Sequence, residues 1–183
     1  MAASLSRAAI LLVVVLAGCS SALNVQYNYN QTVDFTSFRT FDFFPLPSRA
    51  KTNPIVFERV KSGVTRELTR RGLQTASENP DILIAIHTDV TQKVDIANWG
   101  YISNPYDASW RRYGSGGVGT VEAYEYAEGT LILDFVRGGD KIAIWRGIVQ
   151  GVLPKSMDPD TRNAIVDDAV EQVMENYPPP PEE

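Results

Sequence analysis

Cysteine and histidine are almost absent from this sequence. Its 183 residues include one cysteine and one histidine. A single cysteine excludes an internal disulfide and a cysteine-rich zinc site, and a single histidine excludes a multi-histidine metal centre. The sequence therefore predicts no metal site and no cofactor.

Positive charge is also in short supply. The formal net charge is −5 and the isoelectric point is near 5.0, which argues against a broad nucleic-acid surface. Charged residues make up 21% of the chain and hydrophobic residues 44%, a balance typical of globular proteins. We therefore expect a folded domain with no nucleic-acid partner.

The lone cysteine, Cys19, follows an apolar segment near the N-terminus. Arg7 provides a positive charge, and the apolar run Ala8–Ala17 comes next. This run is too short to span a bilayer, which takes about 20 residues, but it fits the apolar core of a secretory signal peptide. The sequence predicts a signal peptide over residues 1–18.

The residues around this cysteine are similar to the lipobox of bacterial lipoproteins, with the sequence Leu16-Ala17-Gly18-Cys19. The resemblance implies that the signal is cleaved before Cys19 and that its thiol and new amino group carry acyl chains such as palmitate. Several acyl chains form a firm membrane anchor, at about 0.8 kcal/mol per buried methylene. The alternative is an ordinary secreted protein with a chance cysteine near its cleavage site.

The residue after the cysteine bears on the destination of such a lipoprotein. In Gram-negative cells, an aspartate at this position favours retention in the inner membrane, and here the residue is Ser20. If the host is Gram-negative, the expected location is therefore the outer membrane, facing the periplasm.

Residues 19–183 are predicted to form a single α+β domain. Asn53-Pro54 and Asp158-Pro159 are typical helix starts, because asparagine and aspartate cap helices and proline suits the first turn. Aromatic and β-branched runs predict strands over residues 24–30, 38–44, 81–97, 120–136 and 141–153. The predicted order is β-β-α-β-β-β-α, a mostly antiparallel sheet with two helices packed on one face.

The predicted strand over residues 81–97 has an apolar face along its whole length. The apolar residues that share this face are Ile82, Ile84, Ile86, Val90, Val94 and Ile96. Alternation with a period of two indicates a strand with one face buried. Leu83 and Ala85 begin the other face, which then turns polar. We therefore expect the first half of the strand to be covered on both faces and the second half on the apolar face alone.

Several short segments along the chain carry a family resemblance. The segments are Asp34-Phe35-x-x-Phe38-x-Thr40-Phe41, Arg71-Gly72-Leu73, Pro80-Asp81-Ile82-Leu83-Ile84 with His87, Glu128-Gly129-Thr130-Leu131-Ile132-Leu133-Asp134, Ile144-Trp145-Arg146-Gly147 and Tyr177-Pro178-Pro179. Together they resemble a bacterial family, the lipoproteins that carry domain of unknown function 4136. The resemblance extends over nearly all of residues 19–183. It implies an envelope lipoprotein, and it lends no catalytic residues because the family has no agreed activity.

The segment from Asn98 to Gly119 is the candidate contact site. Its aromatic residues are Trp99, Tyr101, Tyr106, Trp110 and Tyr113, with Arg111-Arg112 between the last two. Loops of this length are uncommon in compact domains, and aromatic residues with arginine suit protein interfaces and sugar stacking. The alternative is an elongated hairpin tip whose aromatic side chains fold back on the sheet.

No pattern in the sequence marks a catalytic site. His87 is predicted to be packed or hydrogen-bonded, with a pH-sensing role as the alternative, and Arg146 is predicted to pair with Asp134 on the neighbouring strand. Residues 114–119 match the spacing G-x-G-x-x-G, but no strand precedes them and no helix follows, so we interpret them as a flexible loop.

These observations favour a non-enzymatic, lipid-anchored binding or assembly module that faces the periplasm. Its partners would be the membrane, through Cys19, and an envelope protein or glycan. Two alternatives remain open at this point. One is a periplasmic enzyme that acts on cell-wall or lipid substrates through His87 or the strand acids. The other is a carrier with a small-ligand cavity between sheet and helices.

Overall fold

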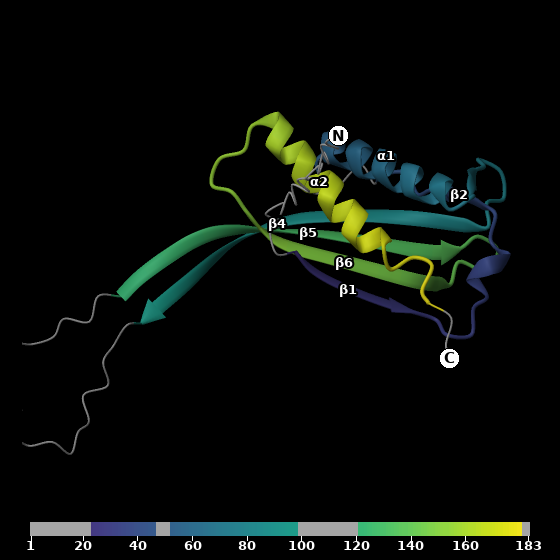
Figure 1. Cartoon of the computed structure of the whole chain (residues 1–183), viewed down its shortest axis with the longest axis horizontal. Coiled ribbons are helices and arrows are strands. Elements are labelled where there is room, and N and C mark those ends of the chain that lie inside the picture. The colour runs from purple at the N-terminus through teal and green to yellow at the C-terminus, as the bar shows by residue number, and fades with distance from the viewer. Residues whose placement is uncertain (1–22, 47–51, 99–120, 181–183) are drawn as a thin grey trace, which may run out of the picture.

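A computed structural model of the protein describes residues 23–46, 52–98 and 121–180, without the side chains of residues 95–98 and 121–123. Two helices cover one face of a six-stranded sheet (Figure 1). The strands are β1 (Asn24–Tyr29), β2 (Thr40–Phe43), β3 (Gln74–Thr75), β4 (Ile82–Asn98), β5 (Val121–Arg137) and β6 (Ala143–Leu153). The helices are α1 (Pro54–Arg70), α2 (Pro159–Met174) and a short 3-10 helix, η1 (Phe35–Ser37).

The chain is α+β overall, but the predicted element order and the predicted pairing of the sheet are wrong. The spatial order is β1-β6-β5-β4-β2-β3, and β2 runs parallel to both β3 and β4. The physical reason is that α1 carries the chain from the end of β2 back to the start of β3 and β4, which forces the same strand direction. The sheet is therefore mixed, with β1, β4, β5 and β6 paired antiparallel.

The short strand β3 is the element that the sequence prediction missed. It consists of Gln74 and Thr75 only, and both are exposed. Two polar residues have no alternation of apolar side chains that could indicate a strand. Gln74 pairs with Thr40 of β2, so β3 forms one edge of the sheet.

Both predicted helix starts are confirmed. The Asn53 side chain accepts a hydrogen bond from the Ile55 N–H at 2.9 Å, and the Asp158 side chain accepts one from the Thr161 N–H at 2.9 Å. Gly72, just after α1, has a φ of 88°, a conformation that glycine adopts at low cost. Neither helix in the described part of the chain is long and apolar enough to cross a membrane.

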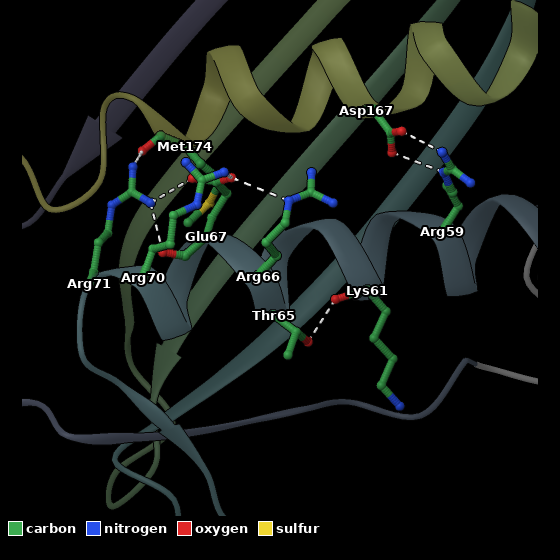
Figure 2. Close-up of polar contacts among 9 residues, drawn as sticks. All are labelled: Arg59, Lys61, Thr65, Arg66, Glu67, Arg70, Arg71, Asp167 and Met174. Atoms are coloured by element: carbon green, nitrogen blue, oxygen red, sulfur yellow. Dashed lines mark hydrogen bonds and ion pairs between the residues drawn. The ribbon is translucent and has the colours of Figure 1, made fainter.

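The hydrophobic core lies between the sheet and the two helices. Its fully buried side chains include Phe41, Val60, Val64, Leu68, Ile82, Ile84, Leu133, Phe135, Trp145 and Val170. Trp145 is 1% exposed, and its indole N–H donates to the Asn176 carbonyl at 3.1 Å. The helices are also joined at their surface, where the Arg59 guanidinium binds the Asp167 carboxylate (Figure 2).

Strands β4 and β5 continue beyond the rest of the sheet as a two-stranded ribbon (Figure 1). Strand β6 ends at Leu153, which pairs with Ala127. Beyond that point β4 and β5 pair only with each other, as far as Asn98 and Val121. The ribbon is thus the part of the sheet that neither helix covers.

Candidate functional site

The ribbon begins where the helical layer ends. Thr52 is the residue just before Asn53, the N-cap of α1. Its hydroxyl accepts a hydrogen bond from the Thr88 N–H at 3.3 Å and donates one to the Thr88 carbonyl at 3.4 Å. On the helix-facing side of β4, Ile86 before this point is 5% exposed. Val90 and Val94 after it are 60% and 58% exposed.

The expectation that the whole apolar face of β4 is covered is therefore wrong. Ile82, Ile84 and Ile86 are buried, whereas Val90 and Val94 lie beyond the start of α1 and face solvent. The alternation of apolar side chains predicts the strand and its two faces. It does not predict how far a helix extends over one of these faces. The structure thus presents an apolar strip, the valine strip, defined by Val90 at the base of the ribbon and Val94 on the ribbon itself.

The opposite face of the ribbon carries an ion pair and is called the polar face below. Lys93 and Glu128 form this pair across the two strands with an N–O distance of 2.6 Å. The hydrogen bond to Glu128 raises the pKa of Lys93 above its ordinary value. The separation of the two faces is incomplete, because Glu125 pairs with Val94 and Tyr126 pairs with Lys93.

The contact residues predicted from the sequence all lie outside the described residues. They are Trp99, Tyr101, Tyr106, Trp110 and Tyr113, and the predicted lipidation site Cys19 lies outside as well. In the sequence, the aromatic segment follows Asn98 and precedes Val121, which are the last residue of β4 and the first of β5. The valine strip is therefore next to the predicted contact segment along the chain, and the sequence prediction missed it because it assigned those valines to a buried face.

His87 lies on the sheet face that the helices leave open, beside Asp134 and Arg146. The predicted pairing of Arg146 with Asp134 is confirmed, because the guanidinium donates to both carboxylate oxygens, with Nη2 at 2.9 Å from Oδ2. This hydrogen bonding raises the pKa of Arg146. His87 Nε2 is 3.5 Å from the same Oδ2, and the imidazole side chain is 59% exposed.

This cluster is poorly arranged for acid–base catalysis. Both oxygens of Asp134 already accept hydrogen bonds from Arg146, whereas a general base must be able to reach the proton that it removes. The hollow beside His87, next to Ala85 and Phe57, measures about 60 Å³. That volume is comparable to about two water molecules. The arrangement fits a surface hydrogen-bond cluster better than a substrate site.

The described residues also contain no candidate metal centre. Within residues 23–46, 52–98 and 121–180, no three histidine, cysteine, aspartate or glutamate side chains lie close enough together to hold an ion.

Comparison with solved structures finds similar folds at low sequence identity, whereas no curated protein matches. A PDZ domain protein from Parabacteroides distasonis is 14% identical with a TM-score of 0.57, and the match covers 86% of this chain and 36% of that one. The PelC dodecamer from Paraburkholderia phytofirmans is 10% identical with a TM-score of 0.47, covering 84% of this chain and 95% of that one. The chain thus spans about a third of the first of these proteins, and at such identities the likeness concerns the fold alone.

A family model described as "Domain of unknown function (DUF4136)" matches residues 25–179. The match runs from β1 past the end of α2, and it includes the segments on which the sequence resemblance was based. The chain belongs to the DUF4136 family.

Proposed function

We propose that this protein is a non-enzymatic envelope lipoprotein that binds a partner through the ribbon formed by β4 and β5. The observation that carries the proposal is the valine strip, because Val90 at the base of the ribbon and Val94 on the ribbon are more than half exposed. The ribbon extends beyond the helices (Figure 1). The aromatic segment from Trp99 to Tyr113 follows this strip in the sequence and would extend the same contact.

An exposed two-stranded ribbon with apolar side chains is unfavourable in free energy. A two-stranded ribbon without a third strand or a helix is marginally stable in water. Burying a valine side chain completely is worth about 1.5–3 kcal/mol, so a partner that covers Val90 and Val94 stabilises the ribbon and gains affinity. Aromatic residues are enriched among the side chains that dominate binding energy, which suits the adjacent segment.

The pairing of β1 supports a position of the proposed lipid anchor near the base of the ribbon. Asn24 in β1 pairs with Gln150, which pairs with Thr130, which in turn pairs with Asp89 in β4. The residues between Cys19 and Asn24 can span no more than about 18 Å. Acyl chains on Cys19 would therefore hold the base of the ribbon close to the bilayer, where an envelope partner is within reach.

Substitution of the valine strip tests the proposal. We expect Val90→Ser with Val94→Ser to reduce the partners recovered after crosslinking in intact cells, because the change removes apolar area and leaves the core untouched. Thr91→Ala, on the polar face of the same ribbon, is the matched control and should leave recovery unchanged. Equal recovery with the folded valine variant would contradict the proposal.

A second variant tests the aromatic segment separately. Alanine at Trp99, Tyr106 and Trp110 should also reduce recovery if the segment belongs to the contact. Unchanged partners with intact folding would restrict the contact to the ribbon itself.

A further inference from the structure

A hollow of about 360 Å³ is lined by residues around η1, just after α1 and just after α2. The end of α2 and the C-terminus lie at the end of the sheet opposite the ribbon (Figure 1). Its lining residues are Phe35, Thr36, Phe38, Arg39, Arg71, Leu73, Tyr177 and Pro178. Ligand pockets for small molecules span about 300–1,000 Å³, so this hollow is at the small end of that range.

Segments far apart in the sequence build this hollow. Phe35 and Phe38 come from the chain around η1, Leu73 follows α1, and Tyr177 and Pro178 follow α2. Each of these segments is among those that carry the family resemblance. The valine strip uses none of these residues, so the hollow is separate from the proposed partner contact.

Tyr177 forms the most enclosed part of the hollow. Its side chain is only 3% exposed, and its ring lies 4.5 Å from that of Phe135, 5.5 Å from that of Trp145 and 5.9 Å from that of Phe35, between centroids. These contacts hold the ring in one position. The phenol is therefore a rigid feature of the hollow.

The hydroxyl of Tyr177 has no hydrogen-bond partner among the residues that the structure describes. In the same part of the chain, every fully buried side-chain polar atom has a partner, so this hydroxyl is not fully enclosed. Tyr177 is one of the residues that line the hollow. Burial raises the pKa of the phenol, which keeps the proton on the oxygen. The group is available as a hydrogen-bond donor.

Arg71 supplies a positive charge next to this hydroxyl. Its Nη1 donates to the Glu67 carboxylate at 2.9 Å and to the Glu67 carbonyl at 2.8 Å, and its Nη2 donates to the Met174 carbonyl at 2.7 Å (Figure 2). These bonds fix the guanidinium against the ends of both helices. Its Nε–H has no partner among the described residues.

Arg39 also lines the hollow, and its guanidinium is likewise held by hydrogen bonds. Its Nη1 donates to the carbonyls of Thr36 and Phe38, and its Nε–H has no partner in the described part of the chain. The nearby carboxylates are already engaged, since Asp34 accepts from Thr36, and Asp81 accepts from Thr40 and from the Arg39 backbone N–H. Among the described residues that line the hollow, the Tyr177 hydroxyl and the Nε–H groups of Arg39 and Arg71 are therefore donors without a partner.

We propose that this hollow binds a small acidic amphiphile, a molecule with one anionic head group and an apolar body. The head group would accept hydrogen bonds from the Tyr177 hydroxyl and from the guanidinium groups of Arg39 and Arg71. The apolar body would lie against Phe35, Phe38, Leu73 and Pro178. A carboxylate or a phosphate monoester meets this description, because both are strong acceptors that arginine binds well.

Calorimetric titration of the full chain carrying Cys19→Ser tests the site with four probes. Octanoate and octyl phosphate combine an anionic head with an apolar body, octanol lacks the charge, and inorganic phosphate lacks the body. We expect at least one of the first two to bind more tightly than octanol and inorganic phosphate. Comparison of the two acids identifies the preferred head group. Equal binding of octanol, equal binding of inorganic phosphate, or no binding of either acid would overturn the proposal.

Two substitutions locate the binding. Tyr177→Phe keeps the packed ring and removes only the hydroxyl, and it should weaken binding of the preferred acid about tenfold, as expected for a hydrogen bond to a charged group. Arg39→Gln should weaken it as well. Arg70→Gln is the matched control, because Arg70 also binds Glu67 but does not line the hollow. Unchanged affinity in a folded Tyr177→Phe variant would contradict the assignment.

Discussion

The hydroxyl of Thr52 lies between the backbone N–H and carbonyl of Thr88, and this contact marks the end of the helical layer on β4. Ile86, two residues before Thr88, is buried, and Val90, two residues after it, is exposed. One continuous strand therefore belongs to two environments, a packed body and a ribbon that neither helix covers.

The first prediction separates these two environments energetically. Ile84→Ala should lower the free energy of unfolding by about 2–5 kcal/mol, because it leaves a cavity in the core. Val94→Ala, on the same face of the same strand, should cost less than about 1 kcal/mol, because the side chain is already in water. Urea denaturation measures both. A comparable loss in the two variants would mean that Val94 is buried in the free protein.

The second prediction concerns the turn between β5 and β6. A Cβ atom at Gly138 would lie 1.8 Å from the Pro80 carbonyl oxygen, whereas one at Gly139 would meet nothing within 4 Å. Gly138→Ala should therefore destabilise the protein by about 1–3 kcal/mol or more, because backbone must move. Gly139→Ala should stay within about 0.5 kcal/mol of the wild type. Thermal unfolding compares them, and equal melting temperatures would contradict the close approach.

The third prediction is a pH dependence that comes from Asp81. Its Oδ2 accepts from the backbone N–H groups of Arg39 and Thr40 and from the Thr40 hydroxyl, at 2.8–2.9 Å. These hydrogen bonds lower the pKa of Asp81 below its ordinary value of 3.8, and the bond from the Arg39 backbone N–H has the largest effect. A lowered pKa in the folded state means that ionised Asp81 stabilises the fold at neutral pH, and that this stabilisation is lost as the pH falls through the lowered value.

Asp81→Asn isolates this contribution, because the amide keeps an acceptor oxygen and loses the charge. The difference in unfolding free energy between wild type and variant should be constant above about pH 5 and should shrink below about pH 4. Denaturation curves at a series of pH values measure it. A difference that does not change with pH would show that the charge of Asp81 contributes nothing.

The fourth prediction concerns the proposed anchor. Cells grown with radiolabelled palmitate should label the wild-type protein, and Cys19→Ser should abolish the label because the only thiol of the chain is removed. Ser20→Ala keeps the cysteine and serves as the control, with labelling retained. Labelling of the Cys19→Ser variant at the wild-type level would refute lipidation at this residue.

Local signals explain what could be predicted from the sequence. Asn53 and Asp158 cap helices through hydrogen bonds within their own first turn, so their neighbours in sequence suffice to identify them. The pairing of Arg146 with Asp134 could also be predicted, because two long strands joined by a tight turn have a restricted register.

The features that were missed depend on distant parts of the chain. Ile86 is buried and Val90 is exposed because of the position at which α1 begins. The residues of β4 themselves carry no signal for that position. Strand β3 forms because β2 offers it an edge, and not because of its own two residues. The hollow at the opposite end brings Tyr177 against Phe35, and no spacing within either segment indicates that contact.

The most direct test of the proposed function is site-specific photo-crosslinking in the native envelope. A photoreactive side chain is placed at Val94, on the valine strip, or at Thr91, on the polar face of the same ribbon. The proposal predicts a discrete crosslinked partner from position 94, lost when Val90→Ser is added, and little product from position 91. The same product from both positions, or none from position 94 in the folded protein, would contradict the role of the ribbon as the binding surface.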